Sequence, residues 1–137
     1  MFASLSHFSL SLLSLLSGLE YQDRRSGAWE KATQAGNETL TLTINVGDMF
    51  EVLTNGRVPA PVHRVVCEPG CPLPRYSIAV FFNPTDTAVI SPIMNHMTGN
   101  KKLYKDVAWA EFRRQRFLGD SADVGRETQV SDYKIKS

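Results

Sequence analysis

The chain has 137 residues, the size of one domain with a single core. Hydrophobic residues make up 42% of the sequence and charged residues 21%, which is ordinary for a soluble globular domain. The formal net charge of +1 provides no excess that would favour nucleic acid or a membrane surface, so we expect neither as a partner.

The first seventeen residues differ from the rest of the chain. After the initiator they contain only Phe, Ala, Ser, Leu and one His, with no acidic or basic side chain. A secretory signal has such an apolar run but usually carries a basic segment before it, and the run is short and serine-rich for a membrane span. Residues 1–17 are therefore either a signal peptide or the sign of a truncated or wrongly joined start. We expect a cytoplasmic protein.

After this segment the pattern is typical of short strands separated by turns. Leu40, Leu42 and Ile44 alternate with threonines, a period of two that predicts a half-buried strand. The next strand is expected to begin in the stretch from Met49 to Leu53. Asn55-Gly56 then has the strongest hairpin signal in the chain.

Two prolines interrupt the strands before the pattern resumes. Pro59 and Pro61 forbid regular pairing, so we expect a brief strand only from His63 to Val66. The stretch from Tyr76 to Phe82 is almost continuously apolar, which predicts a strand buried on both faces. A last short strand is expected at residues 88–90.

Beyond residue 94 the period changes to that of a helix. Asp106 is a plausible N-cap, and Gly119 stands where a helix C-cap would. One face is expected to be apolar and the other to carry arginines, with Val107, Trp109, Ala110, Phe112 and Phe117 on the first and Arg113, Arg114 and Arg116 on the second. The sequence thus predicts a mostly β core at residues 18–94, followed by a helix and tail at residues 95–137.

Three residues stand out for their chemistry. His63 follows a proline-stiffened segment, and a neutral imidazole is the commonest protein ligand for iron, zinc or copper, although a lone histidine in a strand also serves simple packing. Arg75 heads an apolar strand, where its guanidinium needs an anion: either a bound carboxylate or an internal salt-bridge partner. Ser77 lies two residues further on, on the same face of the strand, and can add a hydroxyl donor.

Five short motifs resemble the iron(II)- and 2-oxoglutarate-dependent dioxygenases of the isopenicillin N synthase-like group, and they stand in that family's order. They are Asn45-Val46-Gly47-Asp48, Thr54-Asn55-Gly56, His63-Arg64-Val65, Arg75-Tyr76-Ser77 and Asn83-Pro84. Upstream, Gly18-Leu19-Glu20 and Trp29 resemble a strand of the family and the tryptophan that follows it. The resemblance extends over most of the chain, from about residue 18 to residue 135.

The resemblance implies a fold, an activity and a set of ligands. The fold would be a double-stranded β-helix, or jelly roll, incomplete at its N-terminus and followed by a C-terminal α-helix. His63 would bind Fe(II), and Arg75 with Ser77 would hold the far carboxylate of 2-oxoglutarate. The activity would be that of an oxidoreductase, a dioxygenase that oxidises a small organic substrate and releases succinate and CO2.

The other half of the metal site departs from the family pattern. His7-Phe8-Ser9 precedes a strand-like Leu13-Ser14-Leu15-Leu16 at about the spacing of the family's His-x-Asp, which makes His7 the candidate second imidazole ligand. Ser9, however, stands where the family has a carboxylate, and neutral serine does not replace an anionic ligand. A truncated enzyme therefore competes with a degenerate, non-catalytic β-domain that serves binding or assembly.

Overall fold

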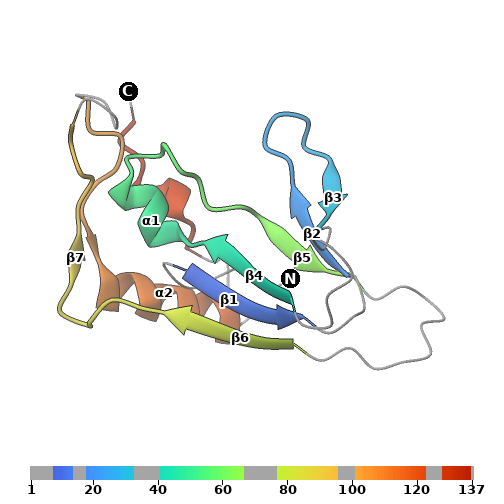
Figure 1. Ribbon diagram of the computed structural model, residues 1–137. Helices are drawn as coiled ribbons and strands as arrows, with labels where there is room; N and C mark the ends of the chain where they lie inside the picture. Colours follow the sequence, from blue (N-terminus) through green and yellow to red (C-terminus); the bar gives the residue numbers. More distant parts are fainter. Residues whose placement is uncertain are drawn as a thin grey trace.

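A computed structural model describes residues 8–13, 18–32, 41–66, 77–95, 101–122 and 128–136 (Figure 1). The described part of the chain holds eight β-strands, two α-helices and one 3-10 helix, which confirms the prediction of a mostly β protein with a C-terminal helix. No helix in these ranges is long and apolar enough to cross a membrane.

Six of the strands form two three-stranded antiparallel sheets. The first sheet has the order β4-β1-β6, formed by Thr41–Val46, Phe8–Leu13 and Ser77–Phe82. The second has the order β3-β2-β5, formed by Trp29–Lys31, Leu19–Gln22 and His63–Val65. The chain passes back and forth between the sheets, because β1, β4 and β6 lie in one while β2, β3 and β5 lie in the other (Figure 1).

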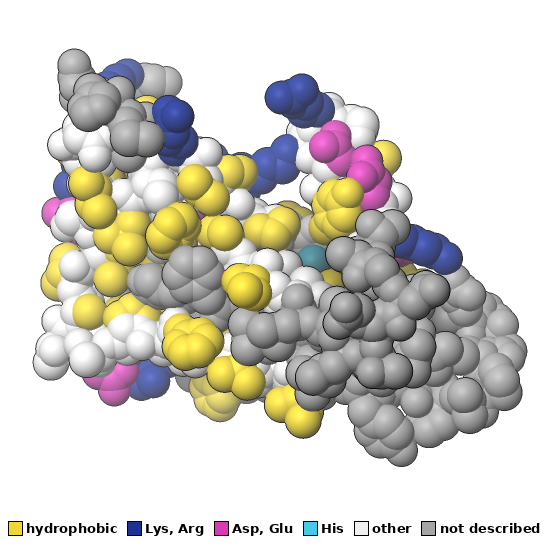
Figure 2. Space-filling view, viewed as in Figure 1, with side chains coloured by type: hydrophobic (Ala, Val, Ile, Leu, Met, Phe, Trp, Pro, Cys, Tyr) yellow, Lys and Arg dark blue, Asp and Glu magenta, His cyan; other side chains and the backbone are white. Residues whose placement is uncertain are grey.

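The strand at residues 77–82 forms as expected, but the prediction that it is buried on both faces is wrong. Ile78 is 63% exposed, Phe82 is 57% exposed, and the residues between them are exposed as well. β6 is an outer strand of its sheet, and its described side chains lie exposed on both faces. Figure 2 shows hydrophobic side chains gathered at the surface over this part of the molecule. The apolar run therefore predicted the strand correctly but did not predict whether its side chains are buried.

The stretch expected to begin the next strand is a helix instead. α1 comprises Asp48–Leu53, and Met49 and Val52 are fully buried on it. Their spacing of three residues places both side chains on one helical face, whereas a strand would direct them to opposite faces. The helical period in Met-Phe-Glu-Val-Leu was present in the sequence, but the run is too short for it to outweigh the neighbouring strand pattern.

The Asn55-Gly56 pair does not close a hairpin, and that prediction is wrong too. The pair ends α1 in a Schellman motif, in which the amide of Gly56 donates to the carbonyl of Glu51 at 2.8 Å and that of Asn55 to Val52 at 2.9 Å. Both residues have positive φ, 52° for Asn55 and 80° for Gly56. The pair that predicted a hairpin thus adopts left-handed backbone at a helix end instead.

Replacing Gly56 by alanine should lower the free energy of unfolding by more than 1 kcal/mol, on the order expected for a strained left-handed residue. The added Cβ would also lie 3.2 Å from Cε2 of Tyr104. Gly27→Ala is the matched control, because Gly27 has a similar φ of 71° with nothing within 4 Å of the added Cβ. Urea denaturation of both variants should show the larger loss for Gly56→Ala. Equal losses would mean that Tyr104 gives way without cost.

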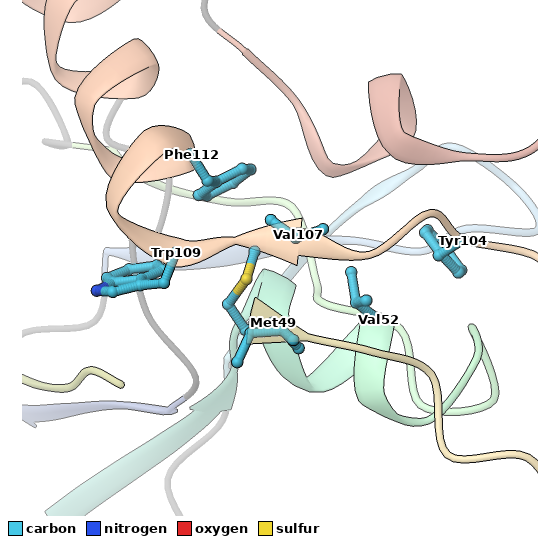
Figure 3. Close-up of a cluster of buried hydrophobic side chains, with 7 residues drawn as sticks. Met49, Val52, Tyr104, Val107, Trp109 and Phe112 are labelled. Carbon is cyan, nitrogen blue, oxygen red and sulfur yellow. The ribbon is translucent and has the colours of Figure 1, made fainter. Parts of the chain in front are cut away.

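The described hydrophobic core lies where α1 meets the C-terminal part of the chain. It is built from α1, α2 (Trp109–Ala122) and the two-stranded sheet of β7 (Val89–Ile90) and β8 (Val107–Ala108). Figure 3 shows the side chains from these elements converging on one another. The buried members are Met49, Val52, Ile90, Tyr104, Val107, Trp109 and Phe112.

The C-terminal helix differs from its prediction at both ends and on both faces. It begins at Trp109, after a short strand, while Asp106 binds Lys102 at 2.5 Å, and it continues past Gly119 to Ala122. Arg116 is 2% exposed and Phe117 is 65% exposed, the reverse of the expected arrangement. The cause is helical spacing, because residues 109, 112 and 116 follow one stripe (i, i+3, i+7) and residue 117 lies about 100° away from it.

Candidate functional site

His63 is the first residue of β5, where the chain enters the second sheet from the proline-rich segment. It is half-buried and pairs with Tyr21 of β2. Its Nδ1 lies 3.2 Å from the carbonyl oxygen of Pro61. A carbonyl only accepts, so Nδ1 carries the proton in this contact and Nε2 keeps the lone pair with which a neutral imidazole binds a metal. Metal-binding histidines commonly have this arrangement, with one ring N–H given to a backbone carbonyl.

The neighbouring residue of β5 has a structural role on the opposite face. Arg64 forms a salt bridge with Glu20 at 2.7 Å, and its guanidinium carbon lies 4.0 Å from the centroid of the Trp29 ring. Because side chains alternate along a strand, these contacts orient His63 away from them. Arg64 therefore ties β5 to β2 and β3.

The segment before His63 is bound by a carboxylate, that of Glu51, which was not among the residues predicted from the sequence. Glu51 of α1 is 1% exposed, and its Oε2 accepts hydrogen bonds from Arg24 at 2.9 Å and from the amide of Ala60 at 2.8 Å. Its Oε1 accepts from the Tyr104 hydroxyl at 2.6 Å. Burial, together with this hydrogen bond, raises the pKa of Tyr104 well above its usual range, so the phenol stays a donor.

Of the remaining predicted site residues, the structure describes the backbone of Ser77. Ser77 is the first residue of β6, opposite Leu13 of β1, and therefore lies in the other sheet from His63. The side chain of Ser77 and the whole of Arg75 and His7 lie outside the described residues. The roles of His63 and His7 as metal ligands, and of Arg75 and Ser77 in holding 2-oxoglutarate, stay predictions.

The strand that was expected to follow the His7 motif begins earlier than predicted. β1 comprises Phe8–Leu13, so Ser9 is already a strand residue, opposite Asn45 of β4 and Phe81 of β6. Within the described ranges no group of three or more His, Cys, Asp or Glu side chains could hold a metal ion. Among the described residues, His63 is thus the one predicted metal ligand whose surroundings can be examined.

Comparison with known families gives a match that covers most of both sheets. The family model described as "2OG-Fe(II) oxygenase superfamily" matches residues 3–84, more than half of the chain. The chain belongs to this superfamily. The predicted family resemblance is therefore confirmed, and with it the association with iron(II) and 2-oxoglutarate that the superfamily's name states.

Individual relatives agree with this assignment. Gibberellin 2-beta-dioxygenase 1 of Pisum sativum is 33% identical over 99 residues, which is 72% of this chain and 29% of that protein. The Neurospora crassa T7H structure, solved with alpha-KG (2-oxoglutarate) and thymine, is 26% identical, covers 87% of this chain and 36% of that one, and has a TM-score of 0.73. A rice dioxygenase for auxin oxidation has a TM-score of 0.75 at 20% identity, covers 97% of this chain and 43% of that one, and shows a shared fold.

These relatives are considerably longer than the present sequence. The chain spans roughly a third of the length of the pea and Neurospora proteins, at 29% and 36%. The chain's membership of the superfamily is established over this part of the protein. The substrate and the activity of the whole protein are proposed below.

Proposed function

We propose that the chain forms part of an iron(II)- and 2-oxoglutarate-dependent dioxygenase domain that oxidises a small organic substrate and releases succinate and CO2. The observation that carries this proposal is the hydrogen bond of the His63 ring, in a chain that belongs to the 2OG-Fe(II) oxygenase superfamily. Its Nδ1–H is engaged by the carbonyl of Pro61, and Nε2 keeps the lone pair that a metal needs.

The fold proposed for the complete domain is a jelly roll of the double-stranded β-helix type. The support is topological, since β1, β4 and β6 form one antiparallel sheet and β2, β3 and β5 form another, so the chain crosses between two sheets as in a jelly roll. In a jelly roll of this kind the ends of strands from both sheets meet at one opening. This would bring β5, with His63, towards the start of β6, where Ser77 lies.

The donor chemistry fits the cofactors in part. A neutral imidazole is a suitable iron(II) ligand, and we propose His63 for that role with His7 as a second ligand. The guanidinium of Arg75 and the hydroxyl of Ser77 suit a carboxylate, so we propose them for the far end of 2-oxoglutarate. When bound, iron and 2-oxoglutarate supply the oxidising chemistry, and the part of these residues is to bind and orient.

The proposed substrate class rests on the relatives. The Neurospora T7H was solved with thymine, and the pea relative is named for a gibberellin, each a small organic molecule. Loops and segments outside the shared core set the substrate in most enzyme families, so the choice among such molecules is not carried over to this chain.

Two substitutions should separate the metal site from the 2-oxoglutarate site. His63→Ala should abolish binding of Co(II), used as a spectroscopic probe for iron(II), because one imidazole of a small ligand set is lost. Arg75→Ala should leave Co(II) binding intact and abolish 2-oxoglutarate binding to the Co(II)-loaded protein. Arg75→Lys should weaken it markedly, since lysine has no bidentate fork. Visible absorption measures the first effect and isothermal titration calorimetry the second.

A matched control is available on α2. Arg113 pairs with Asp86 at 3.0 Å on the surface, and Arg113→Ala removes the same charge as Arg75→Ala. It should change neither binding constant. Unchanged 2-oxoglutarate affinity in Arg75→Ala would show that Arg75 is structural, and unchanged Co(II) binding in His63→Ala would remove the metal assignment.

A further inference from the structure

A buried carboxylate fixes the path of the chain immediately before His63. Glu51 projects from α1, and its Oε2 binds both the side chain of Arg24 and the amide of Ala60. The same Nη2 of Arg24 donates to the carbonyl of Ala60 at 3.1 Å. Both backbone polar groups of Ala60 are thus engaged by this one pair of charged side chains.

Ala60 is the residue of this segment whose amide can donate to Glu51. Pro59 and Pro61 on either side have no amide hydrogen, so Ala60 supplies the one backbone donor of the three residues. The ends of the segment are tied separately, since the amide of Val58 donates to Thr54 Oγ1 at 3.1 Å and that of Gln22 to the carbonyl of Val62 at 2.8 Å. Glu51 therefore controls the middle of a segment whose ends are already placed.

This segment leads directly to the imidazole. From Glu51 the path runs through the Ala60 amide and the next peptide to the carbonyl of Pro61, which accepts the His63 Nδ1 proton. A carboxylate that is 1% exposed is costly to bury unless several donors satisfy it, and here Arg24, Ala60 and Tyr104 all donate to it. These three hydrogen bonds hold Glu51 in place, and through Ala60 and Pro61 they also hold the His63 ring.

We propose that Glu51 is a positioning residue for His63: through Ala60 it places the Pro61 carbonyl, which keeps the proton on Nδ1 and presents Nε2 to the metal. This inference rests on the proposed function only for the statement that His63 binds a metal. Glu51 touches no reacting group and acts through the backbone, as residues behind a metal ligand commonly do.

The proposal can be tested by determining which ring nitrogen of His63 carries the proton. The 15N chemical shifts of the ring, measured in a long-range 1H–15N NMR correlation at about pH 8, give this tautomer. The full 137-residue chain should carry the proton on Nδ1. Glu51→Gln introduces an amide group that cannot accept all three hydrogen bonds, so the proton should move in part to Nε2. Co(II) affinity, measured on the same samples, should fall about tenfold or more, as for other residues behind a metal ligand.

Two further variants separate positioning from general stability. Asp48→Asn is the matched control, because Asp48 is also on α1 and also forms a buried ion pair, with Arg116 of α2. It should lower stability and leave the tautomer unchanged. Arg24→Gln removes the contact to the Ala60 carbonyl, while the Ala60 amide and the Tyr104 hydroxyl still donate to Glu51, so it should fold and shift the tautomer in the same direction as Glu51→Gln.

Each outcome decides a different point. A wild-type ring protonated on Nε2, or an unchanged tautomer in folded Glu51→Gln, would overturn the proposal. If Glu51→Gln does not fold, the result for Arg24→Gln stands in its place. A tautomer shift in a protein that never binds Co(II) would support the positioning role and refute the metal assignment of His63, so the two ideas fail separately.

Discussion

Asp48→Ala is expected to lower the free energy of unfolding by about 3–5 kcal/mol, the usual cost of removing one partner of a buried ion pair. Asp48 is 13% exposed and pairs with Arg116, which is 2% exposed, so this ion pair joins α1 to α2 inside the protein. Without the carboxylate, the guanidinium would stay in a poorly solvated position against the ring of Phe112, whose centroid is 5.5 Å away. Urea denaturation followed by circular dichroism measures the loss.

Two comparisons show whether burial is the cause. Asp86→Ala breaks the ion pair with Arg113 on the same helix, but those side chains are 63% and 50% exposed, so it should cost far less. Replacing both partners, as Asp48→Leu with Arg116→Met, should recover most of the loss, because neither charge then remains buried. A loss for Asp48→Ala no greater than that for Asp86→Ala would contradict the explanation.

Phe112→Ala is expected to cost about 3–5 kcal/mol as well, through the cavity that it leaves in the core. Phe112 is fully buried, with its ring stacked on Trp109 at 6.1 Å between centroids and tilted against Tyr133 at 5.7 Å. Through Tyr133 the ring joins α2 to the 3-10 helix at Val130–Tyr133. Figure 3 shows Phe112 and Trp109 on α2. Loss of the Phe112 ring should lower the urea midpoint.

Phe117→Ala provides the control within the same helix. Phe117 is 65% exposed, so the same truncation should leave the unfolding midpoint almost unchanged. The pair also tests the helical register directly, because the sequence had placed both phenylalanines on the apolar face. If Phe117→Ala were as costly as Phe112→Ala, the register of α2 described here would be wrong.

The candidate site was predictable where its signal is local and the residues are few. The motif His63-Arg64-Val65 was recognised as a short strand, and β5 begins at His63. Glu51 was not recognised, because its importance comes from Arg24 and Tyr104, which lie 27 and 53 residues away along the chain. The one local hint was an alanine between two prolines, whose single amide hydrogen needs an acceptor.

The sequence by itself determined the strands β4 and β6 and the family. Alternation predicted β4, an apolar run predicted β6, and Asn55-Gly56 did adopt positive φ, since each of these depends on neighbours within a few residues. Five motifs in order were enough for the family, because together they are far more specific than any one of them.

The tertiary structure decided what those local signals were used for. The packing of Met49 and Val52 against β8 and α2 made residues 48–53 a helix, and Asn55-Gly56 consequently became its end rather than a hairpin. Arg116 is buried because Asp48 neutralises it from another helix, whereas the apolar side chains of β6 stay exposed. Burial and charge pairing depend on partners distant in sequence, which no local pattern contains.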